Sequence, residues 1–343
     1  MAQSGRNESG NGKIAAMIAT QPPGHALRQA FYADPDIFAR ELERLFVGHW
    51  LCAGHESSAP NAGDYFVVEI ASESAIVVRG EDGVLRAFAN VCRHRGSRIA
   101  TAASGNAKFL VCPYHAWTYG LDGSLSAARH MPADFDKSTH GLKPVNLRVI
   151  EGCVFLSFAA NPLALGHAER TLSECFGPYE WPRARIAHRE RYPIAANWKL
   201  AVENYLECYH CAPSHSEYSR LHALEQPLPR IEKLNARMQE RTAALGLDIP
   251  THEYWGAAAE GEEVVRGFRY ALYDGVETGS PDGKGVAPLL GRFNGYDGGV
   301  TSIHLGPASF LVSYTDHGVI YRFVPRTVGT CEMEVIWLVR ADA

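Results

Sequence analysis

Several features that would direct the interpretation elsewhere are missing from this sequence of 343 residues. No stretch approaches 18 uninterrupted apolar residues, so the sequence predicts no membrane span. Lysine and arginine (33) do not outnumber aspartate and glutamate (38), and the net charge of −5 provides no basic stripe for nucleic acid. No Gly-x-Gly-x-x-Gly motif occurs, so the chain has no sign of a dinucleotide site of its own.

An export signal is missing as well. Residues 13–20 are too short and too weakly apolar for a secretory h-region. Eight cysteines without such a signal indicate a reducing compartment, and we therefore expect a cytoplasmic protein whose thiols bind metal or pack in cores. Four cysteines have apolar neighbours and are interpreted as core thiols: Cys52, Cys153, Cys175 and Cys331.

The first half of the chain is rich in short alternating segments. A helix is expected from Asp34, because an N-cap residue and Pro35 precede apolar residues at helical spacing. Residues 65–70, 74–79 and 85–89 alternate as strands do and are separated by Gly and Asp turns. The pattern predicts an antiparallel β region that continues to about residue 158. The composition then changes after Asn161-Pro162, where a domain boundary is reasonable.

Two cysteines and two histidines stand out in this β region. Cys92-Arg93-His94 and Cys112-Pro113-Tyr114-His115 are separated by seventeen residues, and each pair follows a predicted strand. These four side chains could hold a tetrahedral zinc, but Cys-x-His is tight for two ligands of one zinc, and no zinc-finger helix is predicted. A 2Fe–2S cluster with both histidines on one iron fits the donors better. Three glycines could let the backbone approach such a cluster: Gly96, Gly105 and Gly120.

A second pattern lies at residues 197–215. The spacing predicts one helix that ends near Cys211, before Pro213, with Glu203, Glu207 and His210 on one face. His215 would then return beside His210 and form a divalent metal site with carboxylates beneath it. The alternative is that both histidines are surface or structural residues and that Glu207 is a solvated helix charge. Cys208 and Cys211 are interpreted as packing residues.

Together these motifs resemble a known family. Cys-x-His-x17-Cys-x2-His followed by Ala116-Trp117-Thr118-Tyr119 looks like the cluster motif of the Rieske non-haem iron oxygenases, catalytic subunit. Asn-Trp-Lys-x3-Glu-Asn-x2-Glu-x2-His-x4-His, which begins at Asn197, resembles the mononuclear iron motif of the same enzymes. Carried over by position, the resemblance implies the following roles: Cys92, His94, Cys112 and His115 as cluster ligands, His210 and His215 as iron ligands, Glu207 as the carboxylate that links cluster and iron across a subunit boundary, and Glu203 and Asn204 as further catalytic residues.

The resemblance also implies a branch of the family. Its best-known ring-hydroxylating members usually have aspartate where this chain has Glu207, whereas glutamate looks more like the branch that oxidises glycine betaine, carnitine, choline and stachydrine. Quaternary ammonium groups cannot donate N–H hydrogen bonds, so aromatic cages suit them. Residues 254–323 are rich in aromatic side chains, of which two or three could form a cage: Tyr254, Trp255, Phe268, Tyr270, Tyr273, Phe293, Tyr296, Phe310, Tyr314 and Phe323.

The third ligand of the iron is harder to find. A two-histidine iron site for oxygen chemistry needs a carboxylate, which in the family comes from a C-terminal segment, and we expect that segment to be missing from residues 1–343. Asp316 is the alternative within the chain, although a surface turn is the expected position for it.

The expected fold is α+β: an N-terminal segment (1–45) that packs with the catalytic domain, an antiparallel Rieske domain (46–160), and a mononuclear iron domain (161–343) with a central antiparallel sheet covered by helices. The resemblance implies O₂ as co-substrate, NAD(P)H oxidised by a separate flavin-containing reductase, and a homotrimer. The preferred reaction is hydroxylation and N-demethylation of glycine betaine. The alternatives are an aromatic-ring-hydroxylating dioxygenase, and an electron carrier or inactive homologue with an empty iron site.

Overall fold

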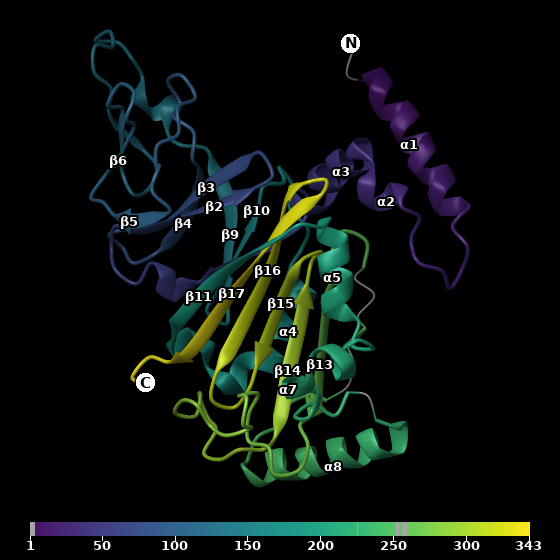
Figure 1. The fold of residues 1–343 in the computed structure, drawn as a ribbon. Helices are drawn as coiled ribbons and strands as arrows, with labels where there is room; N and C mark the ends of the chain where they lie inside the picture. Colours follow the sequence, from purple (N-terminus) through teal and green to yellow (C-terminus); the bar gives the residue numbers. More distant parts are fainter. Residues whose placement is uncertain (1–3, 225, 252–253, 256–258) are drawn as a thin grey trace.

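The computed structural model describes residues 4–224, 226–251, 254–255 and 259–343. Within these residues the chain forms two seven-stranded antiparallel sheets, a small three-stranded sheet and helices that flank the second large sheet (Figure 1). The architecture is therefore α+β, as predicted. None of the helices described is long and apolar enough to cross a membrane.

The first large sheet contains the strands predicted in the first half of the chain. Three of them match the alternating segments within one residue: β2 (Asp64–Ile70), β3 (Glu73–Arg79) and β4 (Leu85–Ala89). The sheet order is β1-β10-β9-β4-β3-β2-β5, with the remaining strands β1 (Leu51–His55), β5 (Ser104–Asn106), β9 (Pro144–Ile150) and β10 (Cys153–Ser157). A small sheet of β6 (Leu110–Val111), β7 (Thr118–Tyr119) and β8 (Leu125–Ala127) lies beside it.

The second large sheet forms the lower half of the molecule in Figure 1. Its strand order is β11-β17-β16-β15-β14-β13-β12, with β11 (Ala184–Ile194), β12 (Tyr254–Trp255), β13 (Val265–Ala271), β14 (Gly299–Leu305), β15 (Ser309–Ser313), β16 (Gly318–Thr327) and β17 (Thr330–Arg340). Helix α8 (Leu228–Ala244) lies at one end, and α4 (Gly166–Phe176) and α5 (Trp198–Leu206) pack on the sheet.

Alternation along β13 separates the two faces of this sheet. A Cβ on Gly267 would lie 3.1 Å from the Thr171 methyl group of α4, so Gly267 faces that helix. Phe268 and Tyr270 point to the opposite face, because neighbouring strand residues alternate. Helix α5 contacts β16 and β17. The second face is where the sequence motif of residues 197–215 lies.

The N-terminal segment contacts α5 through several polar groups. Asp34 caps α3 (Pro35–Glu41) by accepting from the Asp36 amide at 2.9 Å, as its position before Pro35 predicts. The Glu41 carboxylate accepts from Lys199 Nζ at 2.6 Å and from the Trp198 indole at 2.9 Å. These contacts hold the segment against the start of α5. The other helices of this segment are α1 (Ser4–Ala19), α2 (Ala30–Ala33) and a π-helical turn at Leu42–Phe46.

Two buried histidines, His55 and His222, and the partly buried His304 make the fold sensitive to acid. Burial lowers the pKa of His55, His222 and His304 from 6.5 to about 4. As the pH falls from 6.5 towards 4, the unfolded chain binds protons that the folded chain does not, so stability present above pH 6.5 is lost. With three such groups the slope reaches about 4 kcal/mol per pH unit at most. Urea midpoints followed by tryptophan fluorescence should fall steeply between pH 7 and 5, and a constant midpoint would contradict the burial of these rings.

Candidate metal centres and substrate cavity

Two loops with the same backbone geometry carry the Cys-x-His and Cys-x2-His motifs. In each loop the amide four positions after the cysteine, that of Gly96 or Ala116, donates to the cysteine carbonyl at 3.0 Å. Each cysteine amide donates in turn, at 2.8 Å, to the carbonyl five positions later. Gly96 (φ 75°) and Ala116 (φ 55°) both adopt the left-handed conformation that this tight turn needs.

Only one of the three glycines expected near the cluster belongs to these loops. Gly105 lies in β5, paired with Tyr65 of β2, and Gly120 lies in the turn after β7, where its amide donates to Ser124. Ala116 occupies the position that corresponds to Gly96. Gly105 and Gly120 therefore lie outside the two cysteine loops.

The four donor side chains of these loops differ in how deeply they are buried. Cys92 and Cys112 are buried at 3% and 2% exposure, whereas the imidazoles of His94 and His115 lie further out, with ring centroids 4.7 Å apart. Trp117 stacks on His94 at 4.9 Å. Two inner thiols and two outer imidazoles fit a 2Fe–2S cluster that has one buried and one exposed iron.

The zinc alternative requires a different arrangement, in which all four donors converge on one ion. In the part of the chain that the structure describes, no three His, Cys, Asp or Glu side chains converge closely enough to hold a single ion. A two-iron cluster needs only two protein ligands at each iron, so this geometry favours the cluster over zinc.

The helix of the second motif is shorter than predicted. Helix α5 ends at Leu206, five residues before Cys211, and Glu207 already has extended geometry (φ −101°, ψ 114°). Glu203 therefore does not share a helical face with Glu207 and His210, and its carboxylate accepts from the Tyr32 hydroxyl at 2.9 Å. The prediction of one continuous helix was wrong, because the first helix ends at Leu206 and a separate helical turn begins at Cys211.

The shorter helix nevertheless leaves His210 and His215 close together. A single turn, α6 (Cys211–Ser214), separates them, and their ring centroids lie 5.2 Å apart. His210 Nδ1 lies 3.2 Å from Glu207 Oε2. A histidine that donates its Nδ1 proton to a carboxylate presents Nε2 to a metal, which is the usual support of a metal-bound imidazole.

The same two histidines line a cavity of about 970 Å³ on the α5 face of the sheet. Seven tyrosine and phenylalanine side chains contribute to its walls: Tyr205, Tyr218, Phe268, Tyr270, Tyr314, Tyr321 and Phe323. Asn204 and Cys208 also reach it. Burial raises the pKa of the Tyr218, Tyr270 and Tyr314 phenols, so these groups stay neutral. The charged residues among the lining are Arg266 and Glu217, and the rest of the lining combines aromatic rings, among them that of His304, with aliphatic and small polar side chains.

Several aromatics singled out in the sequence lie elsewhere. Phe293 and Phe310 are buried core residues, and Tyr273 and Tyr296 do not line the cavity. The side chains of Tyr254 and Trp255 lie outside the described residues. Tyr205 and Tyr218 line the cavity but are not among the aromatic residues singled out in the sequence. Tyr218 follows His215 by only three positions, and this proximity in the sequence is a signal that points to it.

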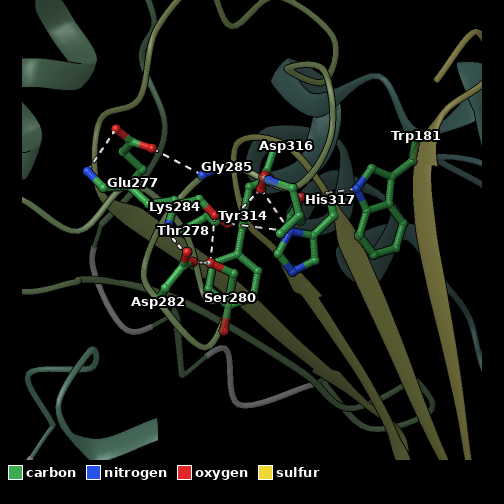
Figure 2. A network of polar contacts seen from close by, with 12 residues as sticks. Trp181, Glu277, Thr278, Ser280, Asp282, Lys284, Gly285, Tyr314, Asp316 and His317 are labelled. Atoms are coloured by element: carbon green, nitrogen blue, oxygen red, sulfur yellow. Dashed lines mark hydrogen bonds and ion pairs between the residues drawn. The ribbon is translucent and has the colours of Figure 1, made fainter. Parts of the chain in front are cut away.

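Asp316 is not the surface residue that was expected. It is fully buried, and Oδ1 accepts from the Thr278 hydroxyl at 2.6 Å and lies 2.8 Å from His317 Nδ1 (Figure 2). Oδ2 accepts from the Val286 amide at 2.9 Å. This carboxylate therefore holds the loop between β13 and β14 onto the β15–β16 turn. Since it does not line the cavity, the alternative of Asp316 as a third iron ligand finds no support.

Cys208 and Cys211 flank His210 with their sulfur atoms 2.6 Å apart. Cys211 is buried and Cys208 is partly buried. Both border the cavity. The four cysteines interpreted as core thiols, Cys52, Cys153, Cys175 and Cys331, are all buried.

Comparison with known protein families gives two matches along the chain. Residues 49–146 match the Rieske [2Fe-2S] domain family. Residues 182–343 match the family described as ring hydroxylating alpha subunit, catalytic domain. The first match covers most strands of the first large sheet, up to the start of β9, and the second match begins just before β11.

Individual relatives agree with these families. The chain is 37% identical over 340 residues to the glycine betaine monooxygenase oxygenase subunit of Chromohalobacter salexigens, covering 96% of this chain and 74% of that protein. It is 40% identical over 196 residues to the carnitine monooxygenase oxygenase subunit of Escherichia coli K12, covering 55% and 52%. Among solved structures, the quaternary ammonium Rieske monooxygenase CntA with a bound inhibitor has a TM-score of 0.66 and 25% identity, covering 92% and 75%.

Proposed function

This chain belongs to the Rieske non-haem iron oxygenases, as a catalytic subunit with a Rieske domain and an iron-binding catalytic domain, and from this membership we propose that it N-demethylates a quaternary ammonium compound. Glycine betaine is the preferred substrate, with dimethylglycine and formaldehyde as products. The reaction would use O₂ and electrons from NAD(P)H, delivered by a separate flavin and iron–sulfur reductase. The names of the two relatives above support this choice of substrate class.

The observation that carries the proposal is the group of tyrosine and phenylalanine rings that line the cavity beside His210 and His215. A quaternary ammonium group has positive charge spread over its methyl groups but no N–H to donate. Ring faces attract such a cation electrostatically without requiring a hydrogen bond. A cavity with tyrosine and phenylalanine walls next to a two-histidine site therefore suits an N-methyl group as the reacting part of the substrate.

We assign the cofactors by donor chemistry. The Rieske 2Fe–2S cluster would be held by Cys92, His94, Cys112 and His115. A mononuclear non-haem Fe(II) would be held by His210 and His215 together with a third ligand. When bound, the two centres supply electrons and activate O₂ for hydroxylation of a C–H bond.

The residues around the centres would orient the ligands. Glu207 contacts His210 Nδ1, and 53% of its side chain is exposed, so it can also accept a hydrogen bond from a neighbouring subunit. We propose that it bridges the iron of one subunit and the cluster of another in a homotrimer. Asn204 borders the cavity and would contact substrate or solvent there. Glu203, which is bound to Tyr32, would fix α5 against the N-terminal segment.

After hydroxylation, the hydroxylated compound breaks down without further help from the protein. The hydroxymethyl ammonium product loses its O–H proton, a C=O bond forms, and the C–N bond breaks with its electron pair passing to nitrogen. Formaldehyde and a tertiary amine result. The cavity needs only to admit the cation, orient one methyl group towards the histidines and release two neutral or zwitterionic products.

A single-turnover experiment tests this proposal. Protein with its iron and cluster reconstituted is reduced chemically, mixed with O₂, and assayed for formaldehyde with glycine betaine, carnitine, choline or stachydrine, and for hydroxylated product with benzoate and naphthalene. We expect formaldehyde in proportion to active sites with at least one of the ammonium compounds. Hydroxylated arene without formaldehyde would contradict the proposal and favour the aromatic-ring-hydroxylating alternative. No product from any compound would favour the electron carrier.

A further inference from the structure

Tyr314 is the cavity tyrosine whose hydroxyl group is most firmly fixed by a buried partner. It follows β15 directly, lines the cavity, and is only 7% exposed. Its hydroxyl oxygen lies 2.9 Å from Nε2 of His222. His222 lies outside the cavity and is 3% exposed. The hydrogen bond therefore joins a cavity wall to an interior histidine.

The surroundings of His222 decide which atom donates. Its Nδ1 lies 2.9 Å from the backbone carbonyl of Tyr218, and a carbonyl can only accept. Nδ1 must therefore carry the proton. Because burial keeps the ring neutral, with its pKa lowered to about 4, Nε2 has a lone pair and no proton. Tyr314 must then donate its phenolic proton to Nε2.

The ring of Tyr314 has little freedom to change this arrangement. The His317 ring stacks on it at 4.6 Å, and the Tyr314 amide donates to the His317 carbonyl at 2.9 Å. Figure 2 shows Tyr314 beside His317 and the loop residues that hold Asp316. On the loop side, a Cβ on Gly279 would lie only 2.3 Å from Tyr314 Cζ, so the loop fits closely against the ring. His222 in turn stacks on Tyr218 at 3.8 Å.

Tyr314 lines the cavity, and with its proton engaged by His222 its hydroxyl oxygen has only lone pairs to offer to a further partner. We propose that His222 is a positioning residue that makes Tyr314 an acceptor for the cationic head of the substrate. An N-methyl group of a quaternary ammonium ion has polarised C–H bonds and no N–H, so an oxygen lone pair attracts it whereas an O–H group would repel it. This inference rests on the proposed function and assigns the recognition of positive charge to one hydrogen-bonded pair.

The test compares two ligands that differ in charge and little else. Glycine betaine and its carbon isostere 3,3-dimethylbutanoate share a carboxylate and three methyl groups, so the ratio of their dissociation constants reports recognition of the positive charge. Anaerobic calorimetry on the metal-loaded protein gives both constants. The variants are Tyr314→Phe, which removes the oxygen, and His222→Leu, which frees the phenolic proton to turn into the cavity. Tyr273→Phe, the same change in a tyrosine that does not line the cavity, is the control.

We expect the wild type to prefer glycine betaine, the preference to fall about tenfold in Tyr314→Phe and in His222→Leu, and Tyr273→Phe to change it less than twofold. The His222→Gln variant, whose amide oxygen can still accept the phenolic proton, should retain most of the preference for glycine betaine. If His222→Leu disturbs folding, the His222→Gln variant tests the role of His222 instead. Iron and sulfide contents should match the wild type throughout.

A preference that survives both the Tyr314 and the His222 changes would overturn the inference. A preference lost in Tyr314→Phe but kept in His222→Leu would overturn the role of His222. Failure of the proposed function has a different signature, because the wild type would then show no preference for the cation and give no formaldehyde in single turnover.

Discussion

Replacement of His210 by alanine is expected to reduce the iron content from about three to about two atoms per chain, while about two acid-labile sulfides are retained. His210 and His215 are the two imidazoles that meet at the cavity, and removing one leaves too few donors to retain the mononuclear metal. Formaldehyde formed in single turnover should fall by about 1,000-fold or more, because the site of C–H oxidation is lost. The cluster should remain visible in the absorption spectrum.

His188→Ala is the matched control. This histidine lies on β11 with 63% of its side chain exposed, so its loss should leave both iron and sulfide unchanged. Three irons in the His210→Ala protein would contradict the assignment of the metal site. Loss of sulfide as well as iron would show that the substitution disturbed the fold rather than one centre.

Replacement of Glu207 by glutamine is expected to reduce turnover by about 100-fold at full iron and sulfide content. The glutamine has the same size, but its neutral amide orients the His210 ring less strongly than a carboxylate that accepts the Nδ1 proton. If Glu207 also accepts a hydrogen bond from a cluster ligand of a neighbouring subunit, the Glu207→Gln substitution also slows electron transfer from the cluster to the iron. Stopped-flow reoxidation of the reduced cluster by O₂ in the presence of substrate measures this step directly.

Two further variants distinguish a bridging role of Glu207 between iron and cluster from a general effect of removing negative charge near the site. Glu207→Asp keeps the charge and shortens the reach, so an intermediate rate is expected. Glu203→Gln removes a carboxylate one helical turn away that is bound to Tyr32 rather than to histidine. The cluster of the Glu203→Gln variant should be reoxidised at close to the wild-type rate. Equal slowing in the Glu203 and Glu207 variants would refute the bridging role.

Much of the chemistry was determined by the sequence alone. The two cluster motifs each span three or four residues, and His210 and His215 are five residues apart, so local spacing suffices to indicate which side chains can meet. The strands β2, β3 and β4 and the cap at Asp34 also follow from local alternation and capping. Resemblance over nearly the whole chain then indicated the family, which the comparisons confirm.

The composition of the cavity, the end of α5 and the burial of Asp316 could be learned only from the tertiary structure. The cavity combines Tyr205 and Tyr218, on helical segments, with Tyr270 of β13 and with Tyr314, which follows β15. No local pattern distinguishes Tyr270 and Tyr314 from core aromatics such as Phe310. The early end of α5 at Leu206 has no Gly or Pro signal in the local sequence. Asp316, in a turn that composition places at the surface, is buried because a loop from 30 residues earlier covers it and supplies its donors. The metal-ligating side chains could be identified from local sequence spacing, whereas the shape of the cavity depends on strand pairing between distant segments.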